Sequence, residues 1–189
     1  MAPALVGLLI RPDARHPVFQ GADDGWLRWM GGPHHGVVEG LATALDWFGQ
    51  GYAALLPVVV AAGLLLARRP RRALFVVTAA LATHAAVQLL KHIVDRPRPD
   101  HPMVSVDHGS FPSGHAALMA MTVVVIGVVF VPVHRRRLWW PVGAVLTAAM
   151  MWSRTWVHAH WLSDTVAGAM VGCGTTLLVT WAMAGWALD

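Results

Sequence analysis

Cysteine is almost absent from this chain: Cys173 is the only one among 189 residues. A single cysteine cannot form a disulfide within the chain, and it cannot build a cluster of thiolate metal ligands. Because Cys173 lies inside an apolar stretch, we interpret it as a small residue packed between helices. Internal repeats and low-complexity tracts are also missing, which excludes a solenoid and leaves a single compact domain as the expectation.

Charged residues are scarce. Only 13% of the residues are Asp, Glu, Lys or Arg, whereas 56% are hydrophobic, and the mean hydropathy is +0.54. A soluble domain usually has roughly a quarter charged residues. Runs of about 18 apolar residues can cross a hydrocarbon core of about 30 Å as a helix, because each residue advances about 1.5 Å. Several such runs are present, so the composition predicts an integral membrane protein built from helices.

Lysine is nearly missing as well, since thirteen of the fourteen basic residues are arginine and Lys91 is the only lysine. A net charge of +4 and an isoelectric point near 10.6 are compatible with nucleic-acid binding. The basic residues, however, fall in short clusters between apolar runs and do not follow the pattern of a basic binding surface. We therefore expect the bilayer, and no nucleic acid, as a partner.

Five apolar stretches are predicted to be spans: 51–67, 73–90, 116–133, 138–152 and 165–188. The fourth is short, but tryptophans flank it, and their rings prefer the membrane interface. Residues 24–49 mix apolar and charged residues, which predicts an interfacial helix followed by a second helix or half-span. The predicted fold is therefore all-α, a polytopic transmembrane bundle of five or six spans. Residues 1–50 form its interfacial or partly inserted region, and 51–189 form its membrane-embedded core.

Clusters of arginine predict the orientation of the bundle. One cluster lies at 68–72, between the first two spans, and the other at 135–137, between the third and fourth. Alternating spans place both clusters on one side, and cationic links favour the cytoplasm. The connections 91–115 and 153–164 then share the other side, so we expect a multi-pass protein of the cell membrane with an extracytoplasmic active site. The first residues lack the basic start and cleavage site of a signal peptide.

These two connections contain the most concentrated polar chemistry of the chain. Lys91, Arg98 and Arg154 suit a dense anion such as phosphate, because the arginine fork binds two oxygens at once and lysine adds a compact charge. Ser113 and Gly114 directly precede an apolar span, where a helix N-terminus offers unpaired N–H donors. The sequence therefore predicts that these five residues bind phosphate.

Histidines supply the reactive groups. His160 and Asp164 are four residues apart and share one helix face, so the carboxylate can accept the Nδ1 proton and leave Nε2 as a nucleophile. His115 comes from the other connection and is a candidate acid for the leaving alkoxide. His158 would point elsewhere on a helix, and we interpret it as an interfacial polar residue. His84, inside a predicted span, is interpreted as structural.

Three motifs resemble, in order, the signature of the type 2 phosphatidic acid phosphatase superfamily. They are K-x6-R-P at Lys91 to Pro99, P-S-G-H at Pro112 to His115, and S-R-x5-H-x3-D at Ser153 to Asp164. The resemblance implies a membrane helix bundle that hydrolyses lipid phosphates without a metal or other cofactor, through a phosphohistidine. It implies His160 as nucleophile, His115 as general acid and Asp164 as orienting partner. The implied phosphate ligands are Lys91, Arg98, Ser113, Gly114 and Arg154.

The expected function is therefore that of a membrane lipid phosphatase. A polyprenyl diphosphate is the first substrate expectation, and phosphatidic acid or phosphatidylglycerol phosphate is the alternative. A non-enzymatic protein that binds or flips lipid phosphates would keep the same anion site, and a lipid phosphotransferase would use the same residues. A zinc site of His115, His158, His160 and Asp164 is disfavoured, because the surrounding cations would repel the metal.

Two aspartates in the loop after Lys91 are not assigned to the predicted site. Asp95 and Arg96 are adjacent, and we interpret them as a pair within the loop. Asp107, in the same loop, has no predicted role.

Overall fold

A computed structural model describes residues 13, 17–31, 35–49 and 55–187. Its elements are helices: α2 (Gln20–Met30), α3 (Val37–Gly49), α4 (Leu55–Leu66), α5 (Pro70–Val94), α6 (Gly114–Val129), the short 3-10 helix η3 (Val133–Arg135), α7 (Arg136–Trp156) and α8 (Leu162–Ala187). No strand occurs in the described residues, so the predicted all-α class is confirmed for this part of the chain.

The predicted spans correspond to consecutive helices. The last four match α5, α6, α7 and α8, and the first matches α4, although residues 51–54 lie outside the described part. Among the described helices, α5 and residues 162–185 of α8 are long and apolar enough to cross a membrane. Helices α4 and α6 are apolar but shorter. The count of five or six spans therefore stays a prediction.

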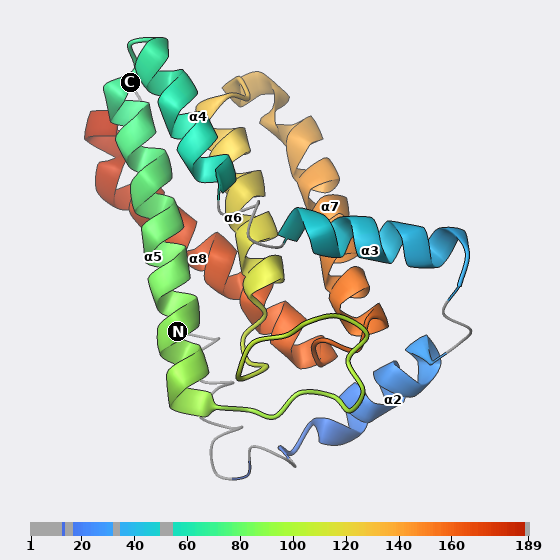
Figure 1. The fold of residues 1–189 in the computed structure, drawn as a ribbon. Coiled ribbons are helices and arrows are strands. Elements are labelled where there is room, and N and C mark those ends of the chain that lie inside the picture. The colour runs from blue at the N-terminus through green and yellow to red at the C-terminus, as the bar shows by residue number, and fades with distance from the viewer. Residues whose placement is uncertain (1–12, 14–16, 32–34, 50–54, 188–189) are drawn as a thin grey trace.

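Helix α6 lies between α5 and α7, with α8 crossing behind it (Figure 1). Most of its residues are buried. Helix α8 approaches it closely because Gly168 and Gly172 have no side chains: a Cβ at Gly168 would collide with the backbone of Ser113, and one at Gly172 with that of Ala117. Small residues four positions apart permit such close helix contact. This packing holds the first turn of α6 against α8.

Helices α2 and α3 lie outside the main bundle. Helix α3 runs across the other helices, and α2 lies beside the long loop that follows α5 (Figure 1). Both contact α7, since Ser153 Oγ donates to Ala42 O of α3 at 2.9 Å and Trp26 Nε1 of α2 donates to Thr155 Oγ1 at 2.9 Å. The two helices predicted within residues 24–49 are therefore present, and both reach the end of α7 that carries the third motif.

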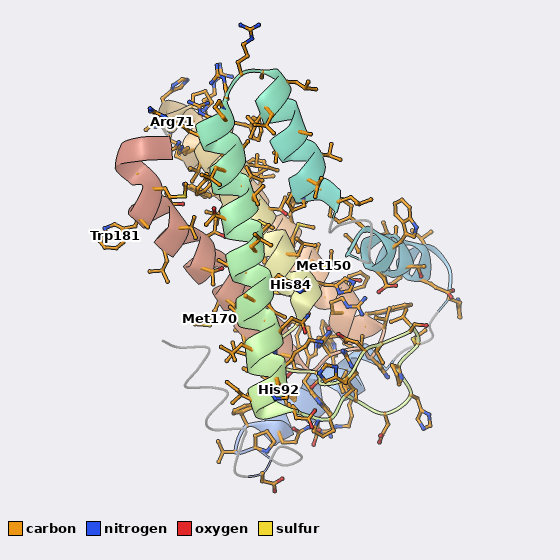
Figure 2. All side chains as sticks on the ribbon, turned by 60° about the vertical axis from the view of Figure 1, so that its left-hand side comes forward. Arg71, His84, His92, Met150, Met170 and Trp181 are labelled. Atoms are coloured by element: carbon orange, nitrogen blue, oxygen red, sulfur yellow. The ribbon has the colours of Figure 1, made fainter. Side chains whose placement is uncertain are left out.

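The bundle has two ends of different character. The loop end is where α5 finishes and residues 95–113 lead into α6; the arginine end carries the turns at 68–72 and 135–137. Figure 2 shows Arg71 and His92 at opposite ends of α5. The predicted sharing of one end by the two motif-bearing connections is confirmed: Met103 N donates to Val157 O, and Ser113 N to Asp164 O, each at 3.0 Å.

Candidate phosphate-binding and catalytic site

Lys91 and Arg98 both contact the carboxylate of Asp107. Lys91 is in the last turn of α5, and its Nζ donates to both Asp107 oxygens at 2.9 Å. Arg98 Nη2 donates to Asp107 Oδ1. Both cations also donate to Gly109 O, at 3.2 and 3.0 Å respectively. A carboxylate in contact with two predicted phosphate ligands holds the place of phosphate oxygens, so Asp107 competes with any anion that binds there.

Asp107 stays ionised in this position. Partial burial raises the pKa of its carboxyl, but the hydrogen bond from Lys91 and the charges of Lys91 and Arg98 outweigh burial and hold that pKa below its ordinary value. Its side chain is 58% exposed. The carboxylate is accessible to solvent, but Lys91 is buried, so its partner can leave at small cost only when another anion takes the same position.

Arg154 reaches the same region from the last turn of α7 and pairs with Asp46 of α3. Its Nη1 donates to Asp46 Oδ1, and both side chains are almost fully buried. The same carboxylate oxygen lies 3.8 Å from Nε2 of His115. Helix α3 therefore brings one carboxylate to both the third predicted phosphate ligand and the predicted general acid.

Ser113 and Gly114 form the start of α6. Ser113 is the N-cap of this helix, and its buried side chain accepts a bond from Ala116 N at 3.5 Å. Beside Gly114 there is room, since the nearest atom to a Cβ placed there would be Val87 Cγ1 at 3.9 Å. Gly114 and His115 are partly exposed, whereas Ser113 and Ala116 are buried. The anion cradle at this helix start stays a prediction.

His160 is buried in the connection between α7 and α8, and both its ring nitrogens have partners. Nδ1 lies 2.7 Å from Ser110 O, and Nε2 lies 3.2 Å from Arg98 Nη1. A carbonyl can only accept and a guanidinium can only donate. These contacts therefore assign the proton to Nδ1 and the lone pair to Nε2, which is the tautomer that a nucleophile requires.

The predicted pairing with Asp164 takes a different form. Asp164 Oδ2 lies 3.7 Å from His160 Nδ1, beyond a hydrogen bond, because Ser110 O takes the Nδ1 proton. The Ser110 carbonyl was missed from the sequence, since a backbone oxygen leaves no signal there and residue 110 comes from the other connection. Asp164 faces the ring as a nearby charge, and its orienting role stays a prediction.

Burial and three cations keep His160 neutral. Removal from water lowers the pKa of its imidazole well below the usual range, and the positive charges of Arg98, Arg154 and Lys91 lower it further. The ring therefore retains its Nε2 lone pair at neutral pH. Within the third motif, a backbone hydrogen bond links His160 to Arg154: His160 N donates to Arg154 O at 3.3 Å.

One interpretation from the sequence is wrong. Arg96 does not pair with Asp95; its guanidinium pairs with Asp23 of α2 and Asp164 of α8. Asp23 is 73 positions away, and nothing in its local sequence signals that contact. Asp46 and Asp107 were likewise not assigned, because only folding brings α3 and the long loop onto the cations.

Two further histidines were interpreted from the sequence, His158 and His84. His158 is half-buried with a left-handed backbone (φ 54°), and His84 is exposed on α5 (Figure 2). Within the described part of the chain, no three His, Cys, Asp or Glu side chains gather in a way that suits a metal ion. The alternative zinc site of His115, His158, His160 and Asp164 therefore does not assemble in this structure.

A helical bundle whose loop end brings three cations to a neutral, buried histidine defines a protein built to act on a phosphate-like anion. A family model, the PAP2 superfamily, matches residues 72–187. The chain belongs to this superfamily and is an enzyme of the phosphatase class, which confirms the family recognised from the three motifs.

Relatives and solved structures agree with this membership. Decaprenylphosphoryl-5-phosphoribose phosphatase from Mycobacterium tuberculosis (strain ATCC 25618 / H37Rv) is 32% identical over 146 residues, which are 74% of this chain and 78% of the relative. The protein of that name from Mycolicibacterium smegmatis is 32% identical over 138 residues, 70% of this chain and 72% of the relative.

Two solved structures share the fold. A transmembrane PAP2 type phosphatidylglycerolphosphate phosphatase from Bacillus subtilis has a TM-score of 0.81 at 20% identity, over 98% of this chain and 96% of that one. Aquifex aeolicus LpxE has a TM-score of 0.67 at 20% identity, over 83% of this chain and 93% of that one.

Proposed function

We propose that this protein is an integral membrane lipid phosphatase that works through a phosphohistidine on His160 and needs no metal. The observation that carries the proposal is the neutral His160, whose Nε2 faces Arg98 while Lys91 and Arg154 complete a cationic site. The exposed apolar side chains on the outer faces of α5 and α8, such as Leu81 and Trp181, suit helices that contact lipid tails.

The proposed reaction has two steps. Lys91, Arg98, Arg154 and the start of α6 hold the phosphate, and Nε2 of His160 attacks phosphorus as the bond to the lipid oxygen breaks. Burial and the charge of Arg154 lower the pKa of His115 to about 3. The negative charge of the bound phosphate would raise this pKa, so that His115 takes up a proton and then gives it to the departing alkoxide. Water then attacks the phosphohistidine, His115 takes a proton from that water, the P–N bond breaks, and inorganic phosphate leaves. Asp107 and Asp46 yield their contacts with the cations to the substrate.

The proposed substrate is a polyprenyl-linked lipid phosphate. The named substrate of the two mycobacterial relatives, a decaprenyl lipid carrying 5-phosphoribose, now ranks above the polyprenyl diphosphate expected from the sequence. Phosphatidic acid and phosphatidylglycerol phosphate are the comparison substrates. In every case the apolar tail would lie against the helices and the phosphate at the loop end.

Phosphate release by the detergent-purified protein, with EDTA present, tests the proposal. We expect wild-type release on at least one lipid of this panel, and a fall of about a thousandfold or more in His160→Ala, because the nucleophile is removed. Release that EDTA abolishes would favour a metal-dependent hydrolase. No release from any lipid would favour a protein that binds or flips lipid phosphates, and release that depends on an acceptor lipid would indicate a phosphotransferase.

We propose the extracytoplasmic side for the loop end, with residues 1–50 as an interfacial region and 51–189 as the membrane core. The arginine turns at 68–72 and 135–137 support this orientation. In a Cys173→Ser background, an impermeant maleimide applied to intact cells should label His101→Cys and spare Arg69→Cys. The reverse labelling would place the site in the cytoplasm.

A further inference from the structure

Arg96 is a fully buried arginine between two buried carboxylates. Its Nη1 donates to Asp164 Oδ1 at 2.7 Å and its Nη2 donates to Asp23 Oδ2 at 2.8 Å. Phe19 and Trp161 flank the guanidinium, with ring centres 5.7 and 5.2 Å away. Its Nε is buried without a hydrogen-bond partner among the described residues, so the two carboxylates must offset most of the cost of burying this charge.

Asp23 fastens α2 to the first turn of α8. Its Oδ1 accepts a bond from Ser163 N at 2.9 Å, and its Oδ2 accepts one from Ser163 Oγ at 2.6 Å. The same hydroxyl accepts a bond from Arg96 Nη1 at 2.8 Å. Asp23, Ser163 and Arg96 therefore form a closed ring of bonds directly before Asp164.

Both oxygens of Asp164 are held. Oδ1 accepts the bond from Arg96, while Oδ2 accepts Trp161 N at 3.0 Å and faces His160 Nδ1. A carboxylate fixed at both oxygens cannot rotate away from the imidazole. Its direction toward His160 is therefore set by Arg96, which reaches Asp164 from the loop, and through Arg96 by α2.

The charges of this group complement the reaction. Two carboxylates and one guanidinium leave one net negative charge beside the Nδ1 face of His160. The cations Lys91, Arg98 and Arg154 lie on the phosphate-binding side. When Nε2 bonds to phosphorus, the ring gains positive charge, and a fixed negative group at the opposite nitrogen stabilises that charge. Burial raises the pKa of Asp164, and the charge of Arg96 and the hydrogen bonds from Trp161 and Arg96 oppose that rise.

We propose that Arg96 and Asp23 are positioning residues of this phosphatase: they hold Asp164 against the nucleophile, so that docking of α2 onto α8 is part of the catalytic arrangement. This inference rests on the function proposed above. Neither side chain contacts the phosphate-binding cations in the bonds described, so their effect is on the formation of phosphohistidine and not on the binding of phosphate.

The test compares Arg96→Gln, Arg96→Lys and Asp23→Asn with the wild type, with Arg135→Gln and Asp100→Asn as controls for exposed residues of the same kinds. Four quantities are measured for each: kcat and KM on the lipid that the wild type hydrolyses best, inhibition by inorganic phosphate, and the thermal unfolding midpoint. Asp23→Asn keeps one oxygen acceptor and replaces the other oxygen by an NH2 donor, so it removes the charge and one acceptor but leaves Arg96 in place. It therefore reports on catalysis even if Arg96→Gln fails to fold.

We expect Arg96→Gln to lower kcat by about 10–100-fold, the usual cost of removing a group that orients a reactive residue. Inhibition by inorganic phosphate should stay within about threefold of the wild-type constant, because its three cations remain. Arg96→Lys should recover part of kcat, and Asp23→Asn should lower it less than Arg96→Gln. Both controls should stay within about twofold.

Two results would overturn the inference. One is a kcat within about twofold of wild type in folded Arg96→Gln or, if that variant is unfolded, in Asp23→Asn. The other is a loss of kcat matched by an equal loss of phosphate binding, which indicates a purely structural role. The variant His160→Ala tells failure of this inference apart from failure of the proposed function. If His160→Ala retains activity, the proposed phosphohistidine function is wrong. If His160→Ala is inactive and Arg96→Gln is fully active, only the role of Arg96 and Asp23 is wrong.

Discussion

Both ends of the bundle carry clusters of cations, which are mostly exposed at the arginine end and mostly buried at the loop end. At the arginine end, Arg68, Arg69 and Arg135 are exposed. Arg136 donates to the carbonyls of Val128 and Val131, at and just after the end of α6. At the loop end, Lys91, Arg96 and Arg154 are almost completely buried, and each contacts a carboxylate.

The two ends differ in the free-energy cost of holding their cations. Taking an ion out of water costs several kcal/mol, and only close, well-oriented partners offset that cost. Exposed arginines carry no such cost, and we expect those at the arginine end to act in membrane orientation. The cations at the loop end pair with carboxylates beside His160, so substitutions at the two ends should differ strongly in their effect on catalysis.

The largest contrast is expected from Arg98→Lys at the loop end. Arg98 donates at once to Asp107, Gly109 and Ala159 while facing His160, and a lysine cannot reproduce that fork. We expect kcat/KM to fall by roughly a hundredfold. Steady-state phosphate release measures it, and a loss below about threefold would show that charge alone suffices at this position.

The protonation of His160 gives a second contrast. Its pKa is lowered, so on acidification the ring should stay neutral at pH values below the ordinary histidine pKa of about 6.5. In Arg98→Gln one neighbouring positive charge is removed, and the pKa of His160 should therefore move upward. Titration of isotope-labelled histidine by NMR, with His160→Ala to assign the signal, measures both; a His160 signal that titrates with the exposed histidines would contradict the environment described here.

Asp107 should show a smaller effect of opposite sign. Because its carboxylate contacts Lys91 and Arg98, Asp107→Asn should strengthen inhibition by inorganic phosphate or vanadate by about fivefold. Asp100→Asn in the same loop is the matched control. Weaker inhibition in Asp107→Asn would mean that this carboxylate assists anion binding instead of competing with it.

The smallest effect is expected at the arginine end. Arg68→Gln with Arg69→Gln removes two exposed charges far from the loop end, and kcat/KM of the inserted protein should stay within about twofold. Phosphate release normalised to the amount of folded membrane protein measures this. A large loss of specific activity would show that the arginine end influences catalysis at the loop end.

Much of this arrangement follows from the sequence. The apolar runs predict α5, α6, α7 and α8 because long apolar stretches must pair their backbone groups internally as helices. The spacing of the three motifs indicates Lys91, Arg98, Ser113 and His160, and it selects His160 over His158. Motifs carry this information because they place reactive side chains at fixed positions on helix ends and their adjoining loops.

The partners of those side chains do not follow from the sequence. Asp23, Asp46 and Asp107 each meet a cation through the packing of a separate segment, and Ser110 meets His160 through a backbone carbonyl that any residue possesses. The chain by itself determined the helices and the reactive groups, because periodicity and residue type are local properties. Only the tertiary structure decided which carboxylate faces which cation, because a buried ion pair depends on distances between segments that are far apart along the chain.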